Sequence, residues 1–314
     1  HETKEEAEKQ VNVMLKLYKD FVNEYLALPI LTGKKSDKEK FVGADYTLTL
    51  EGIMPDGKAL QMGTSHHLGQ NFSKPFDINF LGKDEKQHFT WQTSWGVSWR
   101  LIGALIMIHG DDKGLILPPK IAPIQVVIIP IYYDEVKKKE ILSVIEDITK
   151  QLDGKGIRSY ADSSENHTPG WKFNQWEMKG VPIRIEIGPK DLENNSLVVV
   201  KRTSRDKKNI TINDNLSDHI LKELNTIQDE LFESAKKKHN EMIHRIEDYN
   251  ELCSKLNSEG GFVKSFWCGN RECEDKIKDK TGADIRLIED EMIDSACIVC
   301  RKNATNAVYF AKSY

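Results

Sequence analysis

The spacing of apolar residues predicts helices and strands along the first part of the chain. Residues 1–29 carry apolar side chains at the spacing of an amphipathic helix. Residues 46–51 alternate in strand fashion, and a Pro-Asp-Gly turn separates them from a second strand over 59–62, so we expect a hairpin. Residues 93–119 follow the pattern of a strand, a buried helix and a turn.

A second pattern follows a Pro-Pro pair at 118 and 119. Short β-branched or apolar runs alternate there with amphipathic segments, which predicts an α/β domain. The predicted strands are 124–131, 158–161, 181–187 and 197–200, and the predicted helices are 136–152 and one that begins at Pro169. Residues 216–256 predict one or two long connecting helices packed on one side. A final α/β module, the C-terminal module (residues 262–314), follows Gly260-Gly261.

Composition and charge narrow the class of protein. The chain has 314 residues, of which 39% are hydrophobic and 30% charged. This composition is typical of a globular, multidomain protein of α/β and α+β type. No apolar run approaches the roughly 20 residues that span a bilayer, so we expect no membrane segment. A net charge of −4 gives no global nucleic-acid signature, and RNA contacts would have to come from local patches such as Lys201-Arg202 and 205–208.

The cysteines are confined to the end of the chain. All five follow residue 250, which marks a separate module and favours a reducing, cytoplasmic compartment. Cys268 and Cys273 form one close pair and Cys297 and Cys300 another, the arrangement that a four-thiolate zinc site requires. A redox-active CxxC is the alternative, and Cys253 has no partner by spacing.

Arg100 lies at the start of an apolar segment. If it is buried, it needs a carboxylate or an anion such as phosphate, because an orphaned buried charge costs several kcal/mol. The alternative is that its side chain extends from a core helix to solvent. His66 and His67 admit a metal site, but adjacent residues of a strand face opposite ways, so the two are not expected to serve one site.

Two sequence motifs carry a family resemblance. TSWGVSWRLIGALIMIHGDDKGLILPP (93–119) resembles motif 3 of the class II aminoacyl-tRNA synthetases in its prolyl form, and GTSHHLGQNFSK (63–74) resembles the same enzymes. The chain starts with the HxTxxEA pattern that follows motif 2 in this family. The resemblance, to the eukaryotic and archaeal-like prolyl-tRNA synthetases, covers essentially the whole chain and implies that motifs 1 and 2 lie outside it.

This resemblance implies three parts. Residues 1–120 would be the second half of an antiparallel-sheet class II catalytic domain, 121–225 an α/β anticodon-binding domain, and 226–314 a connector helix and a small α/β domain with a zinc-binding-like site. PGWKFNQWEMKGVPIRIEIGPKDL (169–192) is similar to the prolyl form of the anticodon domain. The family chain also ends in a tyrosine near the active site, and here the last residue is Tyr314.

The resemblance also implies roles for individual residues. Arg100 is the expected catalytic residue, and it would bind ATP together with Gln61, Thr64 and Ser98. His66 and Trp95 would bind proline. The expected tRNA anticodon residues are Lys172, Glu177, Arg184 and Glu186, whose mixed charges suit the donors and acceptors of base edges. The expected zinc ligands are Cys268, Cys273, Cys297 and Cys300.

The implied activity is proline–tRNA ligation. The expected substrates and partners are L-proline, ATP with Mg²⁺, tRNA(Pro) and a second copy of the chain in a homodimer formed through motif 1. Trp99 departs from the family pattern, which has a small hydroxyl residue there, and it would either crowd the nucleotide or pack into the core. The alternative function is a non-enzymatic tRNA-binding or interaction protein built from synthetase domains.

Overall fold

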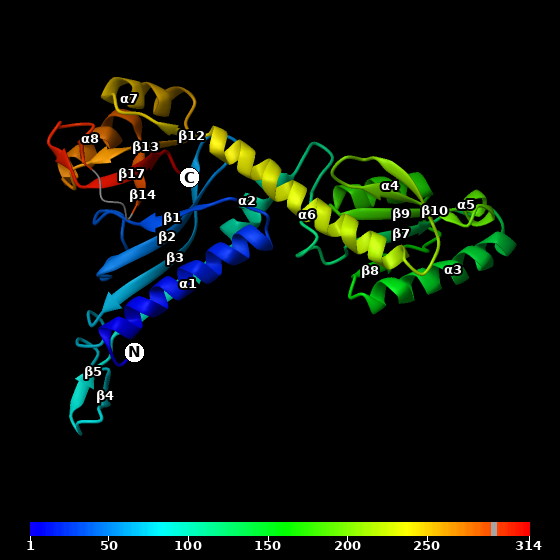
Figure 1. Cartoon of the computed structure of the whole chain (residues 1–314), viewed down its shortest axis with the longest axis horizontal. Coiled ribbons are helices and arrows are strands. Elements are labelled where there is room, and N and C mark those ends of the chain that lie inside the picture. The colour runs from blue at the N-terminus through cyan, green and yellow to red at the C-terminus, as the bar shows by residue number, and fades with distance from the viewer. Residues whose placement is uncertain (290–293) are drawn as a thin grey trace. The chain divides into compact units, whose positions relative to one another are not determined.

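The computed structural model describes residues 1–289 and 294–314, which form two compact units. The first unit comprises residues 1–24, 28–108 and 235–314, and the second comprises residues 25–27 and 109–234. Figure 1 shows the elements of each unit along the chain. None of the helices in the described ranges is both long enough and apolar enough to cross a bilayer.

The first unit is built on one mixed sheet of eight strands. Its order is β12 (Ile243–Arg245), β13 (Phe262–Trp267), β17 (Asn306–Ala311), β14 (Asp284–Ile288), β1 (Leu31–Lys34), β2 (Tyr46–Ile53), β3 (Ala59–Gly69) and β6 (Gln92–Val97). The antiparallel pairing of Lys34 with Ile288 joins the C-terminal module to the N-terminal strands. The sequence pattern did not predict this junction.

Helix α1 (Lys4–Glu24) covers one face of β2, β3 and β6. The Ser65 hydroxyl donates a hydrogen bond to the Val11 carbonyl and fixes this packing. Helices α7 (Tyr249–Ser258) and α8 (Arg271–Thr281) pack with β13, β14 and β17 around a second apolar core. The unit is completed by α2 (Arg100–His109) and the hairpins β4 (Asn79–Leu81) with β5 (Gln87–Phe89) and β15 (Ser295–Ala296) with β16 (Asn303–Ala304).

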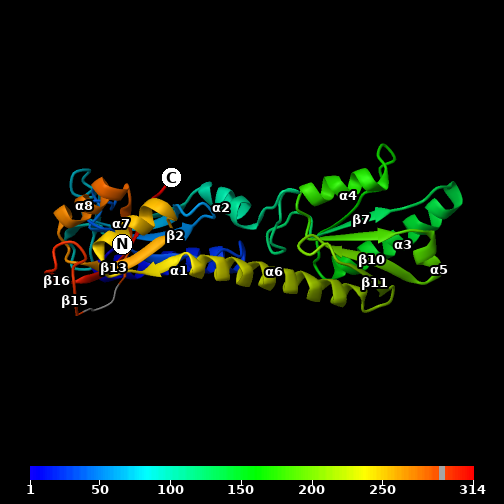
Figure 2. The same cartoon turned by 90° about the horizontal axis from the view of Figure 1, so that it is seen from above.

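The second unit is an α/β domain, as the alternating pattern predicted. Its sheet has the order β11 (Lys207–Thr211), β10 (Ser196–Lys201), β9 (Ile183–Ile187), β7 (Val126–Pro130) and β8 (Ser159–Ala161). Helix α3 (Glu135–Gly154), capped by Asp134, and residues 216–231 of α6 (Leu216–Glu241) pack on one face. Helix α4 (Pro169–Met178) packs on the other, as Figure 2 shows, and the short α5 (Pro189–Glu193) precedes β10.

Two expectations about helices need correction. Residues 242–248 do not continue the long connector, because residues 243–245 form β12 and pair in parallel with β13. The apolar spacing there reflects a strand that packs against β13. Helix α2 is only partly buried, since Ile102 and Ile106 are exposed while Leu101 and Leu105 are buried.

Candidate functional site

One face of the unit-one sheet gathers the polar residues of the 63–74 motif. Thr64 and His66 of β3 lie on the face opposite α1, which we call the site face. The pairing of β2 with β3 shifts by one residue at Met62. This bulge reverses the side-chain alternation and returns Gln61 to the face of Thr64 and His66. The structure therefore brings together three residues that the resemblance assigned to substrates.

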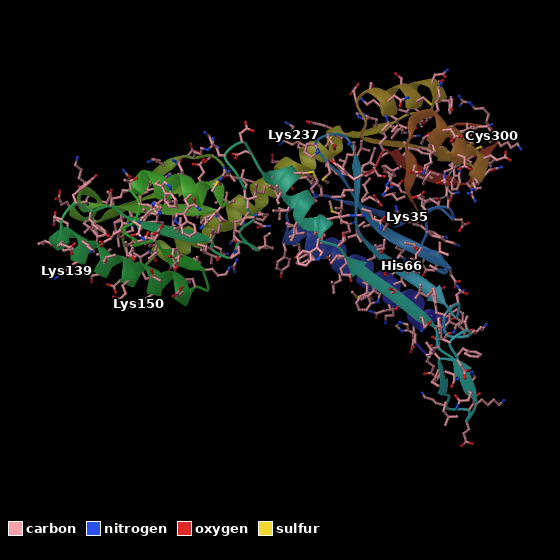
Figure 3. The ribbon with its side chains drawn as sticks, turned by 180° about the vertical axis from the view of Figure 1, so that it is seen from behind. Lys35, His66, Lys139, Lys150, Lys237 and Cys300 are labelled. Atoms are coloured by element: carbon pink, nitrogen blue, oxygen red, sulfur yellow. The ribbon has the colours of Figure 1, made fainter. Side chains whose placement is uncertain are left out.

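His66, labelled in Figure 3, is half-buried, and each of its ring nitrogens lies within hydrogen-bonding distance of a threonine hydroxyl. Its Nδ1 lies 2.9 Å from Thr47 Oγ1 and its Nε2 lies 2.9 Å from Thr64 Oγ1. Burial lowers the pKa of His66 below its ordinary value, which favours the neutral ring with one donor and one acceptor nitrogen. The Phe41 ring lies 5.1 Å away between centroids. Sequence reasoning missed Phe41 because it follows a charged loop.

His67 faces the other way, as strand alternation predicted. The residue is fully buried on the α1 side, where its Nδ1 lies 3.2 Å from Asp45 Oδ2. Its ring stacks on Tyr46 with centroids 5.1 Å apart. The two adjacent imidazoles do not converge, so they do not form one metal site together.

The turn between β6 and α2 places Ser98, Trp99 and Arg100 at the surface. The Ser98 amide donates to the Met62 carbonyl at 3.3 Å, and the Arg100 amide donates to Ser98 Oγ. Within residues 1–289 and 294–314 the structure shows no carboxylate beside the Arg100 guanidinium. The exposed Arg100 guanidinium is therefore available to bind an anion. Trp99 is 86% exposed, which excludes the alternative that it packs into the core.

Trp95 does not share the face of His66. The register pairs Trp95 with Ser65, whose side chain faces α1, and it pairs Ser94 with His66. Directly opposed residues of antiparallel strands project to the same face. The structure therefore places Ser94 beside His66 and does not bring Trp95 there.

A buried ion cluster (Lys35, Glu51 and Arg286) lies next to the residues of the site face. Glu51 Oε1 accepts from Lys35 Nζ at 2.7 Å and from Thr49 Oγ1 at 2.9 Å. The Arg286 guanidinium donates to both Glu51 oxygens, with its shortest distance 3.0 Å to Oε2. Burial lowers the pKa of Lys35, and Glu51 acts in the opposite direction. No sequence motif pointed to this cluster, because its members are far apart in the chain.

The C-terminal tail runs beside the start of β3. The Ala59 amide donates to the Lys312 carbonyl at 2.7 Å. The Tyr314 hydroxyl donates to Met107 Sδ at 3.8 Å, and Lys58 Nζ lies 5.0 Å from the centre of the Tyr314 ring. Burial and Asp56 raise the pKa of Tyr314 to about 12. The tail thus adjoins the strand that carries Gln61.

In the second unit, three of the four expected anticodon residues lie together. Arg184 donates to Glu186 at 2.7 Å, and Lys207 lies 3.1 Å from the same carboxylate. Glu177 accepts from Arg205 at 2.8 Å. Glu177, Arg184, Arg205 and Lys207 help to line a cavity of about 190 Å³.

Lys172 lies apart from that group. It is only 3% exposed, and its Nζ donates to the Asp162 carbonyl at 2.8 Å. The Asp162 carboxylate accepts from Trp176 Nε1. Lys172 instead borders a second cavity, of about 500 Å³, between the segments that follow β7 and β8.

The predicted basic patch is largely neutralised by carboxylates. Lys201 and Lys208 pair with Glu223, and Arg202 and Arg205 pair with Asp111. Arg202 donates to both Asp111 oxygens, from Nη2 to Oδ1 at 2.6 Å and from Nη1 to Oδ2 at 2.9 Å. An RNA phosphate would therefore compete with existing ion pairs at this surface.

The four paired cysteines converge at one point in the C-terminal module. Their Sγ atoms all lie within 4.8 Å of one another, and Cys268 Sγ is 3.8 Å from Cys273 Sγ and 3.7 Å from Cys300 Sγ. A tetrahedral zinc with Zn–S bonds of about 2.3 Å requires sulfur separations of about 3.8 Å. The cluster fits such an ion, and Cys300 marks its position in Figure 3. Cys253 lies outside the cluster, buried in α7.

Comparisons with known proteins cover the whole chain. Residues 249–314 match the family model "Prolyl-tRNA synthetase, C-terminal", and residues 125–223 match "Anticodon binding domain". The chain is 51% identical over its full length to a proline–tRNA ligase of Cenarchaeum symbiosum and 47% identical to one of Natranaerobius thermophilus. It spans 66% and 65% of the lengths of these two relatives.

A solved structure also matches the chain over its whole length. The crystal structure of prolyl-tRNA synthetase from Cryptosporidium parvum, complexed with L-proline and AMP, matches with a TM-score of 0.93 and 40% sequence identity. The match covers 100% of this chain and 68% of that one.

Proposed function

The chain belongs to the prolyl-tRNA synthetase family, and from this premise we propose that it serves proline–tRNA ligation. In this reaction the proline carboxylate attacks the α-phosphorus of ATP, and pyrophosphate leaves to give prolyl-adenylate. A hydroxyl of the terminal tRNA ribose then attacks the prolyl carbonyl, and AMP leaves. The comparisons support this function and not the alternative of a non-enzymatic tRNA-binding protein.

The site face carries the proposal. Gln61 and Thr64 would bind ATP beside Ser98, and the unpaired Arg100 guanidinium would neutralise phosphate charge that develops as pyrophosphate leaves. No covalent enzyme intermediate is needed, because positioning and charge neutralisation carry the reaction. Mg²⁺ would accompany the ATP phosphates.

The proline pocket would centre on His66. Its neutral ring is fixed by two threonine hydroxyls, and Phe41 provides an apolar wall for the compact proline ring. Trp95, which the resemblance also assigns to proline, would have to act from the face opposite His66.

The second unit would bind the anticodon. Glu177 and Arg184 line one cavity, and Glu186 accepts a hydrogen bond from Arg184. Lys172 would contact a base only after giving up its hydrogen bond to the Asp162 carbonyl. We also propose the domain limits that the resemblance implies: 1–120 for the catalytic domain, 121–225 for the anticodon-binding domain and 226–314 for the connector helix and C-terminal domain.

A structural zinc completes the proposal. Cys268, Cys273, Cys297 and Cys300 would hold it and leave no open coordination position, so the ion would stabilise the module and take no part in the reaction. The homodimer and the cytoplasmic location that the resemblance implies remain proposals as well.

Proline-dependent exchange of pyrophosphate into ATP tests this function. The complete polypeptide should catalyse the exchange, and Arg100→Ala should slow it about a hundredfold or more, the usual effect of removing a preorganised charge donor. Exchange that does not depend on proline would refute the assignment of proline as the substrate. Unchanged exchange in Arg100→Ala would refute the role of Arg100.

A further inference from the structure

A chain of polar contacts runs from the C-terminal module to Thr49, which lies opposite a residue of the site face in the strand pairing. Arg286 of β14 donates to Glu51, and Glu51 also accepts from Thr49. Thr49 lies directly opposite Thr64 in the β2–β3 pairing, and Thr64 lies 2.9 Å from His66. A side chain of the C-terminal module is thus linked, through Glu51 and Thr49, to candidate ATP- and proline-binding residues.

Glu51 is the central member of this chain. Its carboxylate is fully buried, and three elements fix it: the segment after β1 through Lys35, β2 through Thr49 and β14 through Arg286. Lys35 and Thr49 bind Oε1, and the closest contact to Oε2 comes from Arg286. Without Arg286 the carboxylate would be held mainly through Oε1 and could rotate.

The register shows what that rotation would disturb. Glu51 pairs across the strands with Gln61, and Thr49 pairs with Thr64. Opposed side chains on one face of antiparallel strands are in contact range, so a displaced Glu51 would move both candidate ATP residues. Arg286 is part of β14 and only 6% exposed, so we infer that it acts through Glu51 and not by touching a substrate.

We propose that Arg286 is a positioning residue for substrate binding: it orients Glu51 and Thr49 and thereby sets the positions of Gln61 and Thr64. The C-terminal module then takes part in ATP binding through the buried ion cluster. This inference rests on the proposed function of the site face.

Steady-state exchange kinetics on the complete polypeptide test the proposal. Arg286→Met should raise the KM for ATP about tenfold and change kcat less than threefold, as expected when a supporting side chain of a binding site is lost. Arg286→Lys should recover most of the affinity, because it keeps the charge beside Glu51. The control Arg245→Met removes an arginine from an exposed pair with Glu247, and it should match the wild type.

A purely structural role gives a different result. If Arg286 only keeps the module folded, Arg286→Met lowers the active fraction, so kcat falls and the KM for ATP stays at the wild-type value. That outcome, or no change in either constant, would overturn the proposal.

A second measurement separates this inference from the proposed function. Histidine-selective ¹⁵N NMR, with the His66 signal assigned through His66→Gln, reports on the ring that binds Thr64. Arg286→Met should shift the His66 signals and Arg286→Lys should restore them; unshifted signals would overturn the inference. A wild type without exchange activity would refute the proposed function alone, since the NMR result would still decide the coupling.

Discussion

Neutralising Glu51 should destabilise the first unit strongly. Glu51→Gln keeps the shape of the side chain but leaves two buried cations, because the Lys35 and Arg286 side chains are only 2% and 7% exposed. Removing one partner from a buried ion pair costs about 3–5 kcal/mol. Since natural domains are stable by about 5–15 kcal/mol, this loss would take a large part of the total.

Urea denaturation of wild type and variant measures the effect, and hydrogen exchange over β2 and β14 locates it. Glu247→Gln is the matched control: it removes a glutamate from an exposed arginine pair, and we expect a loss of less than about 1 kcal/mol. Adding Lys35→Met to Glu51→Gln should restore part of the stability, because it removes one of the two buried charges that have lost their counter-ion. A loss below about 1 kcal/mol in Glu51→Gln would refute the reasoning, since it would mean that both cations reach water.

Three further predictions concern other parts of the chain. Trp99→Thr should change the free energy of unfolding by less than about 0.5 kcal/mol, because the indole is exposed; a larger loss in urea titration would contradict this. Purified protein should contain one zinc per chain by elemental analysis; Cys300→Ser should lose it, Cys253→Ser should keep it, and a folded wild type without metal would refute the site. The Arg202 side chain lowers the pKa of Asp111, so the ion pair stabilises the folded protein at pH values above the ordinary carboxyl pKa. The free energy of unfolding of Asp111→Asn should be about 1 kcal/mol below that of the wild type at neutral pH, and this difference should vanish as the pH falls well below 4. A difference that persists at low pH would contradict the ion pair.

Local elements were predictable from the sequence where short-range physics decides them. Within the β-branched run of 124–131, residues 126–130 form β7 and are all buried. Pro169 begins α4 after the Thr168 cap. The order of strands was not predictable. Apolar periodicity shows which face of a strand is buried but not which strand it pairs with, so the joining of β1 to β14 stayed hidden.

The candidate site was only partly predictable for the same reason. The 63–74 motif identified Thr64 and His66, and strand alternation correctly separated His66 from His67. The bulge at Met62 has no composition signal, although it is what brings Gln61 to the site face. The cysteine spacing, in contrast, correctly indicated a four-thiolate cluster, because paired thiols on short turns leave few arrangements.

Charging of tRNA with proline tests the central claim most directly. The complete polypeptide, supplied with ATP, Mg²⁺, radiolabelled L-proline and tRNA(Pro), should form prolyl-tRNA in which the label is bound through an alkali-labile ester. Omitting ATP should abolish the product, and a tRNA with an altered anticodon should be charged more slowly if the second unit reads that loop. Absence of prolyl-tRNA from a folded protein that binds tRNA(Pro) would contradict the account and favour a binding protein built from synthetase domains.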